Sequence, residues 1–239
     1  MPSGILGKIG VAVSPADSNV VYAIIEAKEG GVYRSADAGK TWQHLYDKPN
    51  LTQRAWYYMH IFAGPKDVNT VYAPQVEGIF KSTDGGKTFA ALKLPHGDVH
   101  SMWINPDRTN VMVSASDGGA AVSTNGGQTW GNIHNQSTGQ FYHVTVDDQF
   151  PYRVYGAQQD NPSFEVASAS ENSGIGPVDV RLSAAGESGW LVPVPRHPWI
   201  TYGGGYGNQL TLLDRRTQVK RSISAWPDNP MGHGAENLK

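Results

Sequence analysis

The sequence contains no cysteine, no long apolar run and no excess of charge of either sign. Without cysteine, disulfide bonds and thiolate chemistry are excluded, although the redox compartment stays open. No apolar stretch approaches the ~20 residues that a membrane-spanning helix needs. A formal net charge of −2 argues against nucleic acid or an anionic membrane as a partner held by bulk charge. Residues 1–7 lack the charged start and apolar core of a secretory signal.

Glycine and proline are abundant, with 28 and 15 copies among 239 residues, and they separate short β-rich runs. This distribution is typical of a turn-dense all-β protein. One short motif also occurs three times, at Ser35–Trp42, Ser82–Phe89 and Ser123–Trp130. Its copies start roughly 40–50 residues apart, the period of a supersecondary unit that must pack on its neighbours.

The shared pattern is Ser-x-Asp-x-Gly-x-Thr-Trp, with Asn125 replacing aspartate in the third copy. Such a pattern predicts a tight turn, because the Asp or Asn accepts backbone N–H bonds and glycine takes a positive φ. We therefore expect the motif to be structural. It resembles the Asp-box, or bacterial neuraminidase repeat, of sialidases, sortilin-type receptors and secreted glycoside hydrolases. The resemblance implies an all-β β-propeller, here a partial array of about five four-stranded blades.

The repeats predict one domain over residues 1–226 and a polar tail over 227–239. Each blade is expected to begin with an inner strand, such as Tyr58–Pro65 in the second blade. The fourth unit carries no clear box, and the fifth has only a degenerate turn at Asp214–Thr217. The predicted blades cover roughly residues 1–48, 49–95, 96–134, 135–186 and 187–226.

Stretches outside the boxes carry a more specific resemblance, to large bacterial sortilin-like glycosyl hydrolases with neuraminidase repeats. Those proteins are longer and typically exported, so the resemblance implies that this chain is an internal piece of such an array. The stretches are Gln53–Tyr58, Pro95–His100, Ser116–Gly119, Gln140–Tyr142, Tyr155–Asn161, Gly186–Trp190 and Trp226–Ala235.

Polar side chains recur at equivalent positions of the repeat, where propeller ligands usually bind. The position just before the inner strand holds Tyr57, Asp98, Gln140 and Glu187, and two residues later come His100 and Tyr142. The turns between second and third strands add Asp117 and the run Gln158–Asn161. We therefore expect Asp98, His100, Asp117, Asp160 and Glu187 to gather at one mouth of the channel.

Three interpretations of this group remain open. The polar side chains could simply bond loop backbone, as in many Asp/Gly-rich turns. They could hold a divalent metal such as Zn²⁺ or Ca²⁺, with His96, Asp98, His100 and Asp117 as ligands. They could also form a glycosidase site, in which Asp98 acts with Glu187 or Asp160 across a gap of about 5–10 Å. A sialidase is disfavoured, because these loops do not carry three arginines.

Aromatic and amide side chains around the same mouth are candidates for substrate binding: Tyr57, Gln140, Tyr142, Gln159 and Trp190. His60 and His143 occupy matching inner-strand positions, where they serve either as ligands or as core histidines. The sequence thus predicts a hydrolase, metal-assisted in one version, that acts on a carbohydrate or promiscuously on esters or phosphoesters. The alternative is a non-catalytic binding or scaffold propeller of the sortilin-receptor kind. A homodimer that covers the terminal blade faces is also expected.

Overall fold

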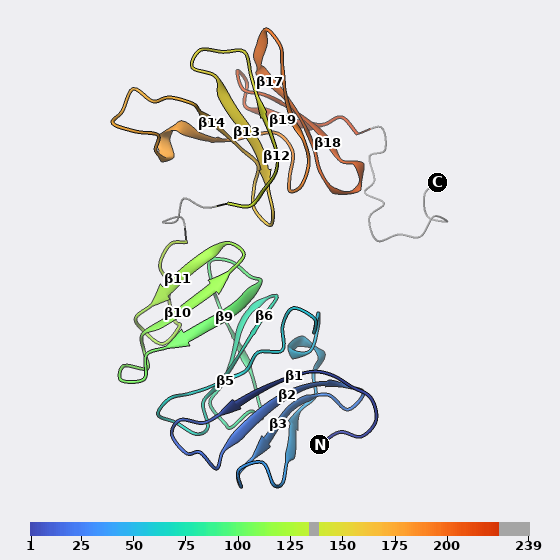
Figure 1. Cartoon of the computed structure of the whole chain (residues 1–239), viewed down its shortest axis with the longest axis vertical. Coiled ribbons are helices and arrows are strands. Elements are labelled where there is room, and N and C mark those ends of the chain that lie inside the picture. The colour runs from blue at the N-terminus through green and yellow to red at the C-terminus, as the bar shows by residue number, and fades with distance from the viewer. Residues whose placement is uncertain (134–138, 225–239) are drawn as a thin grey trace. The chain divides into compact units, whose positions relative to one another are not determined.

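The computed structural model describes residues 1–133 and 139–224, whose regular secondary structure is almost entirely β-strand (Figure 1). The chain divides into two compact units, unit 1 (Met1–Ser137) and unit 2 (Thr138–Lys239). The tail predicted over 227–239 lies outside the described residues. A single domain over 1–226 stays a prediction.

Unit 1 contains three antiparallel sheets in which neighbouring strands follow one another along the chain. The first sheet comprises β1 (Leu6–Val13), β2 (Val21–Ala27), β3 (Gly31–Ser35) and β4 (Gln43–Tyr46). A short 3₁₀ turn, η1 (Pro49–Leu51), leads to the second sheet, which comprises β5 (Phe62–Ala63), β6 (Val71–Gln75), β7 (Gly78–Ser82) and β8 (Ala90–Leu92). The third comprises β9 (Val99–Ile104), β10 (Met112–Ser116) and β11 (Gly119–Ser123), and the segment after it includes residues 134–138, which lie outside the described part.

Unit 2 contains two sheets of the same kind. One comprises β12 (Phe141–Val146), β13 (Arg153–Gln158), β14 (Phe164–Ala167) and β15 (Val180–Leu182), with η2 (Pro177–Asp179) before its last strand. The other comprises β16 (Leu191–Val194), β17 (His197–Gly204), β18 (Leu210–Asp214) and β19 (Val219–Ser222), with η3 (Tyr206–Asn208) between its middle strands. Up-and-down sheets of this order are typical of propeller blades. The predicted all-β propeller class is therefore confirmed.

Apolar side chains on facing blades form the core of each unit. In unit 1, Tyr22 and Ile24 of β2 pack with Val71 and Ala73 of β6. A second cluster joins the second and third blades, around Ile79 and Met102 among others. In unit 2, the core includes Tyr155, Leu191 and Leu213. The central strands are buried on both faces because neighbouring blades sandwich them, so their apolar residues run continuously instead of alternating.

The three boxes are hydrogen-bonded turns that follow the third strand of each blade in unit 1. In the second box, Asp84 accepts hydrogen bonds from the Ser82 hydroxyl at 2.7 Å and from the Thr88 backbone and hydroxyl at 3.0 and 2.6 Å. In the first box, the Trp42 indole donates to the Gly39 carbonyl at 2.9 Å. One backbone N–H of each box also donates to the carbonyl of an asparagine in the turn between the first two strands of the same blade. In the second box, for example, the Gly85 N–H donates to the Asn69 carbonyl. These contacts support the structural role that the pattern predicts.

Replacing Asp84 with alanine is expected to lower the free energy of unfolding by about 1–3 kcal/mol, because several turn hydrogen bonds lose their acceptor at once. Urea unfolding monitored by tryptophan fluorescence would measure the change. Any hydrolytic or binding activity should fall only in proportion to the unfolded fraction. A variant that keeps full stability but loses function would contradict the structural role.

The aspartates of the boxes are also expected to make an acid-sensitive contribution to the free energy of unfolding. Hydrogen bonds from Thr41 and Ser35 lower the pKa of Asp37 to about 2, below its unfolded value. The stabilisation is thus complete above about pH 4 and is lost as the pH falls towards 2. In an Asp37→Asn variant, this portion of the acid transition should disappear. The third box offers an internal comparison, because Asn125 makes the equivalent bond to the Thr129 N–H at 2.9 Å without titrating.

One predicted strand is much shorter than expected. The inner strand of the second blade, predicted over Tyr58–Pro65, is reduced to β5 at Phe62–Ala63. The residues before it form a loop against β1, where the Lys8 ammonium donates to the Trp56 carbonyl at 3.3 Å. Gly10 permits this approach, since a Cβ there would lie 1.9 Å from the Met59 carbonyl oxygen. This loop presents Tyr57 and Tyr58 to the candidate site.

Within the described residues, no helix has the length and apolar character required to cross a membrane.

Candidate functional site

The predicted site residues fall into one group in each unit. Unit 1 holds Tyr57, His96, Asp98, His100 and Asp117. Unit 2 holds Gln140, Tyr142, Gln159, Asp160, Glu187 and Trp190. The gathering of Asp98 with Asp160 and Glu187 at one mouth stays a prediction. Within each unit, however, most of the predicted residues contact one another.

In unit 1, the loop before β9 and the turn between β10 and β11 bring Asp98, His100 and Asp117 together. The backbone N–H of Asp117 donates to the Asp98 carbonyl at 3.3 Å. His100 Nε2 lies 2.9 Å from Asp117 Oδ1. We call this group, together with Tyr58 and Arg54, the Asp98 cluster.

Two side chains from the loop before β5 contact the Asp98 carboxylate. The Tyr58 hydroxyl donates to Asp98 Oδ1 at 2.5 Å, and Arg54 Nη1 lies 3.4 Å from the same oxygen. The Tyr58 ring stacks on His100 with centroids 5.2 Å apart, and the Arg54 guanidinium lies over the Tyr57 and Tyr58 rings. Burial, and then the Asp98 carboxylate, raise the pKa of the Tyr58 hydroxyl well above its usual value. Tyr58 therefore remains a proton donor to Asp98 at any ordinary pH.

In unit 2, a hydrogen-bonded chain joins the ends of β12, β13 and the loop before β16. Tyr142 donates to Gln159 Oε1, and Gln159 in turn donates to Asp160 Oδ1 at 2.8 Å. The Tyr206 hydroxyl lies 3.3 Å from that of Tyr142 and donates to Glu187 Oε1 at 3.0 Å. These five residues form the Glu187 cluster. The hydrogen bonds with Tyr142 and then Glu187 raise the pKa of Tyr206 to about 12.

Two further predicted residues border the Glu187 cluster. The Trp190 indole stacks on His143 with centroids 4.1 Å apart, and Trp190 is 53% exposed. Gln140 contributes its backbone, whose carbonyl accepts a hydrogen bond from the Gln159 N–H at 2.8 Å. His143 thus supports an exposed aromatic surface, whereas its counterpart His60 lies exposed beside the Asp98 cluster.

Left-handed backbone conformations collect in the loops that carry both clusters. Non-glycine residues with positive φ in these loops are Arg54, Met59, Asp98, Asp160, Ala185 and Ser188. Each such residue costs of order 1 kcal/mol, and strain of this kind often concentrates at functional sites.

The four predicted metal ligands make separate contacts. His96 Nδ1 lies 2.9 Å from the Gly97 carbonyl, while Asp98 is held by Tyr58 and His100 pairs with Asp117. In the part of the chain that the structure describes, no three His, Cys, Asp or Glu side chains form a group suited to a metal ion. The divalent-metal site stays a prediction, and the present side-chain arrangement does not supply a three-ligand set.

Sequence reasoning missed Tyr58 and Tyr206 as partners of the carboxylates, and it gave Arg54 no role. For Tyr58 and Arg54 a signal existed, because both belong to the specific stretch Gln53–Tyr58. Tyr206 lies in a glycine-rich turn, Gly203–Gly207, that shows no periodic pattern. Only its contacts with Tyr142 and Glu187 reveal it.

The chain is similar to known proteins of two kinds. It is 26% identical to a xyloglucanase from Hypocrea jecorina, an alignment that covers 91% of this chain and 30% of that protein. It is 30% identical to sortilin from Danio rerio over 52% of this chain and 16% of sortilin. The chain therefore spans less than a third of the length of these relatives. Among solved structures, the GH74 enzyme of Niastella koreensis superposes with a TM-score of 0.48 at 12% identity, covering 90% of this chain and 38% of that one.

The family model described as "Sortilin, neurotensin receptor 3" matches residues 30–173. The match begins in the first blade, includes all three boxes and reaches the connection between β14 and β15. It confirms the sortilin-like resemblance that the boxes and the intervening stretches indicate. Because the matched region exceeds half of the sequence, the chain belongs to the Sortilin-Vps10 family.

Proposed function

We propose that this chain is part of a polysaccharide hydrolase in which Asp98 and Glu187 supply the reacting carboxyl groups. One observation carries the proposal. Asp98 directly precedes β9, whereas Glu187, predicted to stand just before its strand, lies earlier in the loop that leads to Leu191 of β16. Each carboxylate accepts a hydrogen bond from a tyrosine hydroxyl, Tyr58 or Tyr206. A repeated carboxylate–tyrosine pair at loops that the fold presents to solvent suits recognition of hydroxyl-rich ligands.

Exposed aromatic side chains accompany both pairs. Trp56 and Tyr57, beside the Asp98 cluster, are 71% and 56% exposed, and Trp190 lies beside the Glu187 cluster. Aromatic faces stack on the apolar faces of sugar rings, while polar groups beside them fix the hydroxyls. Large exposed aromatic residues next to carboxylates thus favour a carbohydrate over a small ester or phosphoester.

Glycoside hydrolysis requires two carboxyl groups on either side of the bond that is cleaved. One donates a proton to the glycosidic oxygen as the bond from C1 breaks. The other takes a proton from the attacking water, or attacks C1 itself. Within unit 1, Asp98 can act with Asp117, and within unit 2, Glu187 can act with Asp160. The similarity to a xyloglucanase supports this class and makes xyloglucan the first substrate to test.

A second candidate function is glycan or peptide binding without turnover. The observation that favours it is that the Arg54 and Tyr58 side chains both contact the same oxygen of the Asp98 carboxylate. A carboxylate held in this way is well ordered for recognition. The similarity to sortilin supports the same alternative.

Two measurements would separate these functions. One is reducing-end release from xyloglucan, mixed-linkage glucan and xylan, and the other is affinity electrophoresis in gels that contain the same polysaccharides. The hydrolase proposal predicts release of reducing ends that persists after chelator treatment, because Asp98, Glu187 and their tyrosines need no metal. Retardation in the gel with no product would favour the binding function. Loss of activity in chelator with recovery in Zn²⁺ or Ca²⁺ would instead support the metal site at His96, Asp98, His100 and Asp117.

A further inference from the structure

The two blades of unit 2 lack a box, and a cavity of about 980 Å³ opens beside the turns that replace it. In blade four, residues 168–179 form a long connection between β14 and β15 in place of the tight turn. In blade five, the turn at Arg215–Gln218 takes that place. The lining residues that matter most are Phe150, Arg153, Arg181, Trp199, Arg215 and Arg216.

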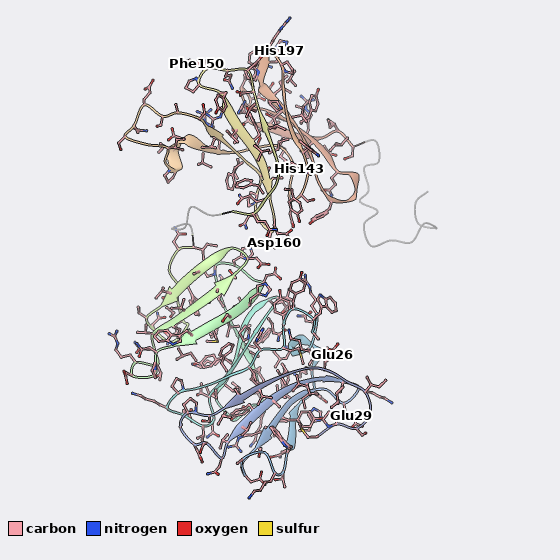
Figure 2. The ribbon with its side chains drawn as sticks, viewed as in Figure 1. Glu26, Glu29, His143, Phe150, Asp160 and His197 are labelled. Carbon is pink, nitrogen blue, oxygen red and sulfur yellow. The ribbon has the colours of Figure 1, made fainter. Side chains whose placement is uncertain are left out.

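This cavity and the Glu187 cluster lie at opposite ends of β13. Arg153, which begins the strand, lines the cavity, whereas Gln159 and Asp160 follow its last residue. Figure 2 shows the labelled side chains of Phe150 and Asp160 at the two ends of these sheets. The cavity is therefore separate from the proposed hydrolytic site, and its function can be tested independently.

The inner wall of the cavity carries more positive than negative charge. Glu165 is fully buried and pairs with two guanidiniums, Arg153 at 3.1 Å and Arg215. The buried Arg153 Nε lies at ion-pair distance from Glu165 but donates no hydrogen bond within the described residues. Arg181 is the register neighbour of Glu165 on β15, so it projects from the same face of the blade. Arg153 and Arg215 thus share the Glu165 carboxylate, and the Arg181 side chain projects from the same face of the blade as Glu165.

Arg181 is the cationic group available to a ligand. No hydrogen bond or ion pair of its side chain is found among the described residues. Arg216, by contrast, pairs with Asp214 at 2.8 Å and lies over the Trp199 ring. The acidic residues of the lining are Glu171, which is exposed, and Asp179, whose carboxylate accepts hydrogen bonds from Ser170 and Gly176 of its own connection.

We propose that this cavity binds an acidic saccharide, with a carboxylate or sulfate group on Arg181 and the sugar rings against the apolar wall. A guanidinium matches the planar geometry of a carboxylate and can bond it through two N–H groups. The cavity volume lies in the range of small-molecule sites and is much larger than an inorganic anion requires. Phe150, which is fully exposed, and Trp199 supply apolar surface for sugar C–H groups. One free guanidinium suits a single anionic group rather than a polyphosphate.

Isothermal titration calorimetry of the full chain would test the proposal with a galacturonic acid trisaccharide, the matched neutral galactose trisaccharide and sodium sulfate. We expect the acidic trisaccharide to bind at least about tenfold more tightly than the neutral one, and binding to weaken as NaCl is raised. Arg181→Gln should weaken binding at least about tenfold, and Phe150→Ala should weaken it to a smaller extent. Both residues are exposed, so the variants should stay folded.

Arg108→Gln serves as the matched control, because Arg108 is an exposed arginine in a turn of unit 1. It should leave the affinity unchanged within about twofold. Equal affinity for the acidic and neutral trisaccharides would overturn the proposal, as would unchanged binding in Arg181→Gln. Sulfate binding as tight as the trisaccharide would overturn the saccharide assignment.

Discussion

Replacing Asp98 with asparagine is expected to lower the rate of polysaccharide hydrolysis at least about 10²-fold while the protein stays folded. Asparagine is nearly isosteric, so its carbonyl oxygen can still accept the hydrogen bond from Tyr58 and the contact with Arg54. What it loses is the ability to give or take a proton, or to attack C1. The measurement is kcat for reducing-end release, with urea unfolding as the check on folding.

Glu187→Gln provides the parallel test in unit 2, because it keeps the hydrogen bond from Tyr206 but removes the ionisable group. It should also reduce kcat at least about 10²-fold. Asp107→Asn is the matched control, since Asp107 is an exposed aspartate in the turn after β9, at the opposite end of that strand from Asp98. Unchanged kinetics in both variants would move the chemistry elsewhere. A loss of polysaccharide affinity without a change in kcat would favour the binding function.

Replacing Glu165 with alanine is expected to cost about 3–5 kcal/mol of unfolding free energy, the typical cost of removing one partner of a buried ion pair. Glu165 is fully buried, and the side chains of Arg153 and Arg215 are only 10% and 12% exposed. Without the carboxylate, two guanidiniums would face each other in a poorly solvated space. Burial already lowers the pKa of Arg153, but an arginine cannot escape by losing its proton at ordinary pH.

Urea unfolding would measure this change, and near-ultraviolet circular dichroism would show whether packing around Tyr155 is lost. Glu171→Ala is the matched control, because Glu171 is exposed beside the same cavity, and it should change stability by less than about 0.5 kcal/mol. An unfolding free energy of Glu165→Ala equal to that of the wild type would show that the Arg–Glu–Arg cluster does not stabilise unit 2.

The sequence alone determined the repeat, the class of fold and the family. The boxes depend on bonds between residues two to four positions apart, such as Ser82 to Asp84 and Asp84 to Thr88. Interactions of this range are visible in a pattern because the turn needs those residue types at that spacing. The same periodicity aligns one repeat on the next and places Asp98 and Glu187 in the loops that lead into the inner strands of their blades.

Only the tertiary structure decided what those carboxylates contact. Tyr58 and Asp98 are 40 residues apart, and Arg215 and Glu165 are 50 residues apart. Such pairs form when blades pack face to face, and no local pattern records which side chains then meet. The packing of neighbouring blades also accounts for the short β5 and for the left-handed residues beside the clusters. It accounts as well for the cavity in place of the missing boxes. Local turn chemistry fixes where a strand can end, whereas the packing of neighbouring blades decides where it does end and which side chains it presents.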